Sequence, residues 1–255
     1  MGISKTLGNE AATRWRRFGM LLKDVFSGLE KRAAINIAFG SIDMDYKAFT
    51  DHELTSPFAQ SLLHTFKDEN AVKRVVEDYY VGQSIAGSAM FWYVDKDEIL
   101  RTAKFVEFNS RGKVENERPY WLHSEMKEKG KLPQEWQRKR TLFGEHLLTR
   151  AENRKRKVCI VNTEQAAIVM AILYPQYVWL ANTERNLSCN RFDAIKGREV
   201  AMVPLFDNNG KQIEAMAENC RELNSNGFLT EVVRWWPENP ITGRVKAVSD
   251  WIMGL

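Results

Sequence analysis

The sequence predicts an α/β protein whose carboxy-terminal half contains a parallel β-sheet. Two observations lead to this expectation. From about residue 154 onward, short apolar runs with strand character alternate with segments of helical character. The last helical segment, residues 211–227, closes on Gly227, a residue type that commonly terminates helices. Strands separated by helices favour a parallel sheet with helices on both faces and right-handed crossovers.

The elements of this sheet follow one another along the chain. We expect strands at residues 157–161, 177–181, 199–206 and 228–236, and helices at residues 164–174, 190–197 and 211–227. The first strand leads into a polar turn, Asn162 to Gln165. In α/β proteins a turn at this position is where ligand-binding and catalytic groups lie, so it is the first place to look for function.

A smaller α+β region precedes the sheet. Ser56 and Pro57 have the residue types of a helix N-cap and first helical position. We expect two short helices and then two antiparallel strands, at residues 56–66, 69–80, 88–95 and 99–109. Gly82 is expected to end the second helix. The strands are joined by a charged turn, Asp95 to Glu98.

The beginning of the chain predicts a helix with one apolar face. In residues 11–34, apolar side chains recur at spacings of three and four, with arginines elsewhere. We interpret this segment as a helix packed on the body, with a helix that binds a partner or nucleic acid as the alternative. The expected domains are an N-terminal helical extension (1–55), a small α+β subdomain (56–150) and a parallel-sheet domain (154–255).

Composition is typical of a globular protein. The 255 residues are 44% hydrophobic and 27% charged, and the formal net charge is +4. This mild basicity permits a polyanionic partner without requiring one. Three widely spaced cysteines with no paired Cys or His spacing argue against a structural zinc site. We find no signal peptide and no apolar run of membrane-spanning length, and we expect a cytoplasmic protein without a membrane partner.

Several blocks of sequence resemble a known family. They are Val75–Gly82, Met90–Asp95, Thr141–Leu148, Tyr174–Ala181 and Ile195–Val200. In this order they resemble uncharacterised Toprim-like proteins of bacterial mobile genetic elements, which are related in layout to the catalytic core of bacterial primases. The resemblance implies a Toprim-like parallel sheet preceded by a primase-like subdomain. Relatives usually begin with a cysteine-rich zinc module, and the first fifty residues here contain no cysteine.

The resemblance also implies a magnesium site that is degenerate in this chain. Toprim domains hold Mg²⁺ with acids at the carboxyl ends of parallel strands, because this cation prefers oxygen ligands. Where the family reads Val-Glu-Ser-Glu-Lys, this chain has Asn162 in place of the principal Glu, followed by Glu164. Leu205 stands at a second acid position, with Asp207 two residues on. The implied catalytic residues are Glu164, Asp207 and Asn162, with Glu164 and Asp207 as the ligands of one weakly held Mg²⁺. The alternative interpretation is that Glu164 is a helix-start carboxylate and Asp207 a turn residue.

Basic residues form two short runs. In a primase-like layout a groove between the two subdomains holds single-stranded nucleic acid, and clustered Lys and Arg supply its affinity. A solvated charge run is the alternative interpretation. The candidate nucleic-acid-binding residues are Arg138, Lys139, Arg140, Arg154, Lys155, Arg156, Lys157, Arg185 and Arg198.

Three functions are compatible with the sequence. The first is a protein that binds single-stranded DNA or RNA through a degenerate Toprim-like site, with little or no catalysis. The second is a Mg²⁺-dependent nuclease or primase-like nucleotidyltransferase that uses Glu164 and Asp207. The third is a protein-interaction module or inhibitor of host machinery. The neutral Asn162 favours the first, because an amide cannot accept a proton near neutral pH.

Overall fold

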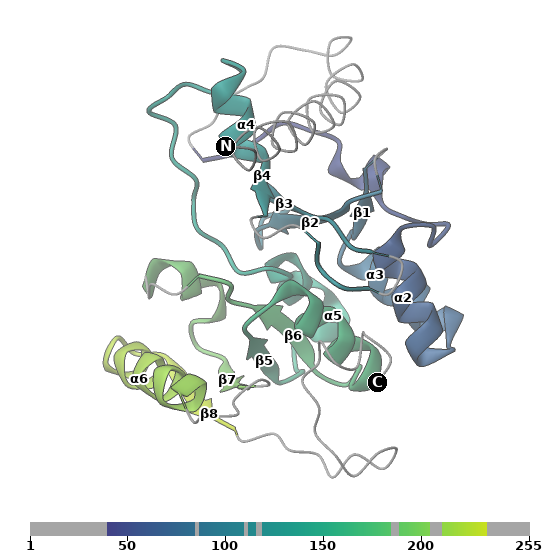
Figure 1. Ribbon diagram of the computed structural model, residues 1–255. Helices are drawn as coiled ribbons and strands as arrows, with labels where there is room; N and C mark the ends of the chain where they lie inside the picture. Colours follow the sequence, from purple (N-terminus) through teal and green to yellow (C-terminus); the bar gives the residue numbers. More distant parts are fainter. Residues whose placement is uncertain are drawn as a thin grey trace, which may run out of the picture.

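The computed structural model describes residues 40–84, 87–109, 112–115, 119–184, 189–204 and 211–233. The helix expected at residues 11–34 lies outside the described residues, and so do Arg185, Leu205 and Asp207. Two four-stranded sheets organise the rest of the molecule (Figure 1). No helix of the described part is long and apolar enough to span a membrane.

The first sheet is antiparallel and has the strand order β1-β2-β3-β4. Its strands are β1 (Gly82–Gln83), β2 (Ala89–Val94), β3 (Leu100–Val106) and β4 (Tyr120–Trp121). The central pair is the antiparallel hairpin that the sequence predicts. Phe91 lies opposite Lys104 and Tyr93 opposite Thr102, so these four side chains share one face of the sheet. This face points toward the parallel sheet and is part of the larger hydrophobic core.

Two helices pack beside this sheet, α2 (Pro57–Phe66) and α3 (Glu69–Asp78). Ser56 caps α2 by accepting a hydrogen bond from the Ala59 amide, as its residue type predicts. Asp68 caps α3 in the same way. Correcting the expectation for Gly82, α3 ends before it, and Gly82 pairs with Met90 in β1. An added Cβ there would lie 2.9 Å from Trp92 Nε1 and 3.0 Å from the Phe49 backbone carbonyl, which explains the glycine without any helix end.

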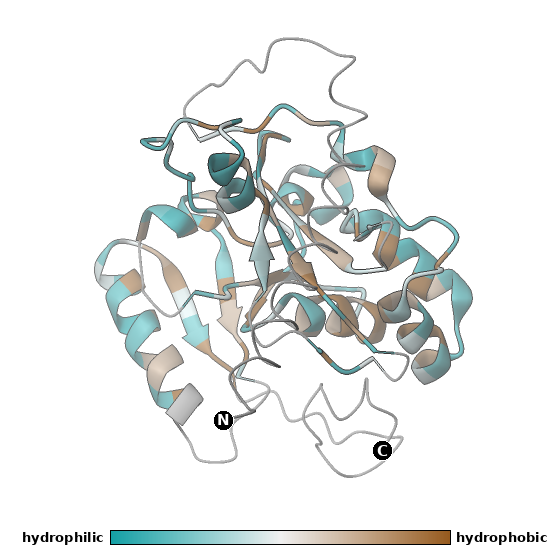
Figure 2. Cartoon of the chain, turned by 45° about the horizontal axis from the view of Figure 1, so that its top comes forward, coloured by the Kyte–Doolittle hydropathy of each residue, from teal (hydrophilic) through white to brown (hydrophobic). Residues whose placement is uncertain are grey.

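The second sheet is parallel, with the strand order β6-β5-β7-β8. Its elements are β5 (Val158–Val161), α5 (Glu164–Leu173), β6 (Val178–Ala181), the 3₁₀ helix η4 (Cys189–Ile195), β7 (Glu199–Met202), α6 (Lys211–Ser225) and β8 (Leu229–Val232). The predicted α/β class, with a parallel sheet flanked by helices, is therefore confirmed. The inner elements of this domain are apolar: the strands β5 and β6 are fully buried and α5 is mostly buried, whereas α6 carries many polar residues. Figure 2 shows this contrast in hydropathy.

Two hydrophobic clusters lie on opposite faces of the antiparallel sheet. The larger one joins α2 and α3 to α5 and the parallel sheet, so it is continuous across the domain boundary expected at 150–154. The smaller one includes Ile42, Met44 and Tyr46, together with the helix α4 (Leu122–Glu128). Residues 40–55 thus contribute to a core, and they include the 3₁₀ helix η1 (Tyr46–Phe49).

His146 lies in the 3₁₀ helix η2 (Glu145–Thr149) and is fully buried. Its Nε2 donates to the Asp78 carbonyl at 2.9 Å, its ring stacks on Tyr80, and among the described residues its Nδ1 has no hydrogen-bond partner. Burial lowers the pKa of His146 from 6.5 to about 4. The imidazole therefore stays neutral in the folded protein near neutral pH.

This burial predicts an acid-sensitive stability. The unfolded chain takes up a proton at His146 near pH 6.5 and the folded chain only near pH 4, so the free energy of unfolding should fall between these values. The loss from this residue is about 3 kcal/mol, and it levels off below pH 4. Urea unfolding at several pH values tests this, with His146→Gln as the non-titrating control. Equal acid losses in the two proteins would contradict the assignment.

Candidate functional site

The carboxyl ends of β5 and β6 lie side by side, because the two strands are parallel and in register. Asn162 directly follows β5 and is half-buried. Thr163 then caps α5 by accepting a hydrogen bond from the Ala166 amide, and Glu164 is the first residue of the helix. On the neighbouring strand, residues 182–184 follow β6. The predicted turn is therefore at the edge of the sheet where α/β proteins bind ligands.

Glu164 is fully buried and is neutralised by the antiparallel sheet. Its Oε2 lies 3.0 Å from the Lys104 ammonium of β3, and its Oε1 accepts a hydrogen bond of 2.6 Å from the Tyr93 hydroxyl of β2. Burial, and next the adjacent carboxylate, raise the pKa of Tyr93 well above its ordinary value, so the hydroxyl stays a donor. Tyr93 also contacts the Thr183 hydroxyl at 2.9 Å, which links both strand ends to the antiparallel sheet.

A second carboxylate, Glu184, lies among three arginines. Arg138 donates to its Oε1 and Arg191 to its Oε2, and the Arg140 Nε is 3.7 Å from Oε2. Arg191 comes from η4 and is only 2% exposed. Burial lowers the pKa of Arg191, and the nearby Glu184 opposes this shift. We call the residues Lys104, Arg138, Arg140, Glu164, Glu184 and Arg191 the carboxyl-edge cluster.

The cluster has more positive than negative charge. Four cations, Lys104 and three arginines, lie around two carboxylates, which leaves two positive charges in excess. Trp121 of β4 lies beside the cluster, with the Arg138 guanidinium 4.8 Å from its ring centroid. Arginines and a partly exposed aromatic ring are the groups that hold phosphates and bases of single-stranded nucleic acid.

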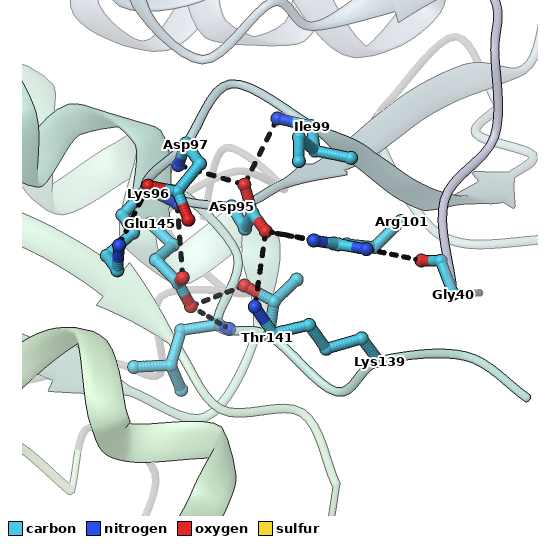
Figure 3. A network of polar contacts seen from close by, with 10 residues as sticks. Gly40, Asp95, Lys96, Asp97, Ile99, Arg101, Lys139, Thr141 and Glu145 are labelled. Carbon is cyan, nitrogen blue, oxygen red and sulfur yellow. Dashed lines mark hydrogen bonds and ion pairs between the residues drawn. The ribbon is translucent and has the colours of Figure 1, made fainter. Parts of the chain in front are cut away.

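The segment that carries Arg138 and Arg140 is also held by an ion pair of the residue between them, Lys139. Lys139 points away from its two neighbours, toward the fully buried Asp95 at the end of β2, at 3.6 Å (Figure 3). Asp95 also accepts hydrogen bonds from Arg101 Nε at 2.9 Å and Nη2 at 2.6 Å. Burial alone would raise the pKa of Asp95, but the hydrogen bonds from Arg101 and from the Ile99 amide hold it below its ordinary value.

Glu145 completes this network on the side of the parallel sheet (Figure 3). It accepts hydrogen bonds from the Thr141 hydroxyl and from the amides of Leu142 and Lys96. Burial raises the pKa of Glu145, although these hydrogen bonds oppose the shift. Residues 139–142 are thus held by the carboxylates of Asp95 and Glu145, whereas Arg138 and Arg140 contact Glu184 at the carboxyl edge.

The structure does not bring all the predicted basic residues together. Arg154, Lys155 and Arg156 are exposed and precede β5, so they lie at the amino edge of the sheet, about 13 Å from the carboxyl edge along the strand. Lys157 at this edge pairs with Glu231 of β8. The two basic runs therefore lie at opposite edges of the sheet, and nucleic-acid binding by the second run stays a prediction.

Arg198 has a structural role at the same amino edge. Its guanidinium donates to the carbonyl groups of Leu148, Asn153 and Arg156. These bonds anchor the turn that leads into β5. The remaining predicted cation, Arg185, lies outside the described residues.

The described carboxylates do not fit a magnesium site. Glu164 already has a lysine on one oxygen and a tyrosine hydroxyl on the other, and the Glu184 oxygens face three arginines. A Mg²⁺ ion requires several oxygen ligands that are free of competing cations. The described residues contain no group of three or more potential metal ligands. Asp207, the predicted second ligand, is outside them, so the pair Glu164–Asp207 stays a prediction.

Sequence reasoning missed Lys104, Tyr93 and Arg191. The sequence contains a signal for Lys104: a lysine inside a strand whose other residues are buried requires an anionic or hydrogen-bonding partner. Tyr93 gave none, since a tyrosine in a buried strand is ordinary core material. Arg191 gave none either, because a single arginine in a predicted helix is usually exposed to solvent.

Comparisons with known proteins agree with this architecture. By its fold, the chain is primase-like: the DnaG primase catalytic domain bound to ssDNA has a TM-score of 0.50 at 11% identity, over 73% of this chain and 67% of that one. The RNA polymerase domain of Mycobacterium tuberculosis primase DnaG in complex with double-stranded DNA has a TM-score of 0.47 at 10% identity, over 74% and 69% of the two chains.

The family is shown by sequence. Residues 56–206 match the model of the family described as Domain of unknown function (DUF6371), and the match spans more than half of the chain. The protein belongs to this family. No curated protein is significantly similar to it.

Proposed function

We propose that this protein binds single-stranded nucleic acid at the carboxyl-edge cluster, without using a metal ion for chemistry there. The observation that carries the proposal is the neutralisation of Glu164 by Lys104. A general base or metal ligand must be free to exchange a proton or bind a cation, and this carboxylate is instead held in a buried ion pair. What remains at the edge is an excess of arginine charge.

The arginines are suited to phosphate. A guanidinium offers two parallel N–H donors, which match the oxygens of a phosphate group. Arg138 and Arg140 lie on an anchored segment, and Arg140 has a side chain that is 46% exposed. The primase catalytic domain with the matching fold is bound to ssDNA, which supports a nucleic-acid ligand for this chain as well. Trp121 offers a stacking surface next to the arginines.

The wider assignment follows from the family resemblance. We propose that the chain is a Toprim-derived protein of a mobile genetic element, in which Asn162 replaces the principal acid of an ancestral magnesium site. Any residual Mg²⁺ binding would use Glu164 and Asp207, and it would have to displace Lys104 first. The resemblance also implies a Gly-Gly after the second strand of the parallel sheet, where this chain has residues 182–185. This replacement fits the same history, because Glu184 adds a side chain where the relatives have bare backbone.

A comparison of two charge-matched variants tests the proposal. The double variant Arg138→Ala/Arg140→Ala removes two cations from the carboxyl edge, and Arg154→Ala/Lys155→Ala removes two from the amino edge. Binding of a labelled single-stranded oligonucleotide is measured by fluorescence anisotropy over a range of salt concentrations. We expect the first variant to bind about tenfold more weakly and the magnitude of its salt slope to fall by about 1.4, which is about 0.7 for each of the two contacts.

The amino-edge variant is the control, and we expect it to change affinity by no more than about threefold. If it loses more affinity than the carboxyl-edge variant, the interface is on the other side of the sheet. If the wild-type protein shows no salt-dependent binding to DNA or RNA single strands, the proposed function is wrong.

A further inference from the structure

We propose that Glu184 is an internal anion that occupies a phosphate-binding site formed by Arg138, Arg140 and Arg191, and that a backbone phosphate of the nucleic acid displaces it. The inference rests on the proposed function and adds the ligand group and a competing residue. In the ligand-free protein the carboxylate holds the three arginines together, and in the complex a phosphate takes its place.

The geometry around Glu184 is that of a bound anion. Arg138 approaches one carboxylate oxygen, and Arg191 and Arg140 approach the other. A carboxylate offers two oxygens to these three guanidinium groups, whereas a phosphate group offers more acceptors in a tetrahedral arrangement. One negative charge among three positive ones also leaves the site short of anionic charge.

Arg191 indicates that the site is built for a larger anion. Its side chain is 1% exposed and is fixed by a hydrogen bond of 2.5 Å to the Asn182 Oδ1. Its Nε is buried and has no hydrogen-bond partner among the described residues. A buried donor on a charged group is costly unless a bound ion or water satisfies it. The Arg191 Nε–H is therefore available to donate a hydrogen bond to a bound anion, next to the Nη2 that contacts Glu184.

The Glu184 side chain lies where it can move away from the three arginines. It lies in the irregular segment that follows β6, and its side chain is 26% exposed, so water reaches it from one side. Rotation of this side chain into solvent uncovers the three arginines without moving a strand or helix. Each contact between Glu184 and an arginine must be broken before a phosphate binds, so Glu184 lowers the apparent affinity of the site.

Removing the charge of Glu184 should therefore strengthen binding. We expect Glu184→Gln and Glu184→Ala to bind a single-stranded oligonucleotide about tenfold more tightly than the wild type, which corresponds to one charge-assisted contact no longer opposed. Glu231→Gln is the control, because it makes the same change in net charge on the outer strand β8, where Glu231 pairs with Lys157. We expect it to alter affinity by no more than about twofold.

A second probe separates this inference from the proposed function. Inorganic pyrophosphate is added to each protein, and its stabilising effect is followed as the shift in thermal unfolding temperature. If no variant binds an oligonucleotide, but pyrophosphate stabilises Glu184→Gln more than the wild type, the proposed function fails and the phosphate site stands. If both Glu184 variants fold and bind the oligonucleotide and pyrophosphate no better than Glu231→Gln, Glu184 does not compete with phosphate and the inference is wrong.

Discussion

Lys104→Met is expected to lower the free energy of unfolding by about 3–5 kcal/mol, because it leaves the Glu164 carboxylate buried without its cation. Glu164 is fully buried, and the Tyr93 hydroxyl is then its only remaining partner among the contacts described above. Methionine keeps most of the length of the lysine stem, so the loss reports on charge more than on packing. Equilibrium unfolding in urea measures it.

A double-mutant cycle identifies the origin of the loss. Glu164→Gln removes the charge but keeps an acceptor for Tyr93, so the combined variant Lys104→Met/Glu164→Gln should recover at least about 2 kcal/mol. Lys47→Met is the matched control, since Lys47 pairs with Glu98 at 3.2 Å on the surface. It should cost no more than about 1 kcal/mol. Additive effects of the two substitutions would show that Lys104 does not neutralise Glu164.

Arg101→Met is expected to cost a similar amount, about 3–5 kcal/mol, through the network of Figure 3. The Arg101 side chain is 7% exposed and Asp95 is fully buried. The guanidinium satisfies Asp95 with two of its nitrogens and donates to the Gly40 carbonyl at 2.8 Å with the third. Its removal leaves a buried carboxylate and a backbone carbonyl with fewer donors, and Lys139, whose side chain is 54% exposed, cannot supply the two parallel N–H donors of a guanidinium.

Arg150→Met is the control for this prediction. Arg150 also pairs with an aspartate, Asp78, but the two side chains are 25% and 37% exposed. Urea unfolding should therefore show a clearly smaller loss for Arg150→Met, of about 1 kcal/mol. If the two arginine variants lose equal stability, burial of the Asp95 pair does not set its energetic importance.

The fold follows from local signals in the sequence. The N-cap predicted at Ser56 and the alternation of strands and helices give element bounds close to those observed. Parallel topology then places Asn162 and Glu164 at the carboxyl edge, because residues that follow parallel strands meet there. The candidate site was therefore located from sequence, at least on the side of the parallel sheet.

The partners of the site were not predictable in this way. Lys104 and Glu164 are 60 residues apart and meet only because the antiparallel sheet packs over the strand ends. The run 138–140 reads as one basic patch, but in an extended segment neighbouring side chains point in opposite directions, so Lys139 separates from Arg138 and Arg140. Contacts of this kind depend on how the sheets pack, which periodicity does not encode.

The most direct test of the whole account is the affinity for a single-stranded oligonucleotide measured in Mg²⁺ and in EDTA at matched ionic strength. Because Lys104 already supplies the positive charge at Glu164, we predict equal dissociation constants and an unaltered oligonucleotide in both solutions. Binding that is lost in EDTA, or cleavage or extension of the strand that requires Mg²⁺, would contradict the account.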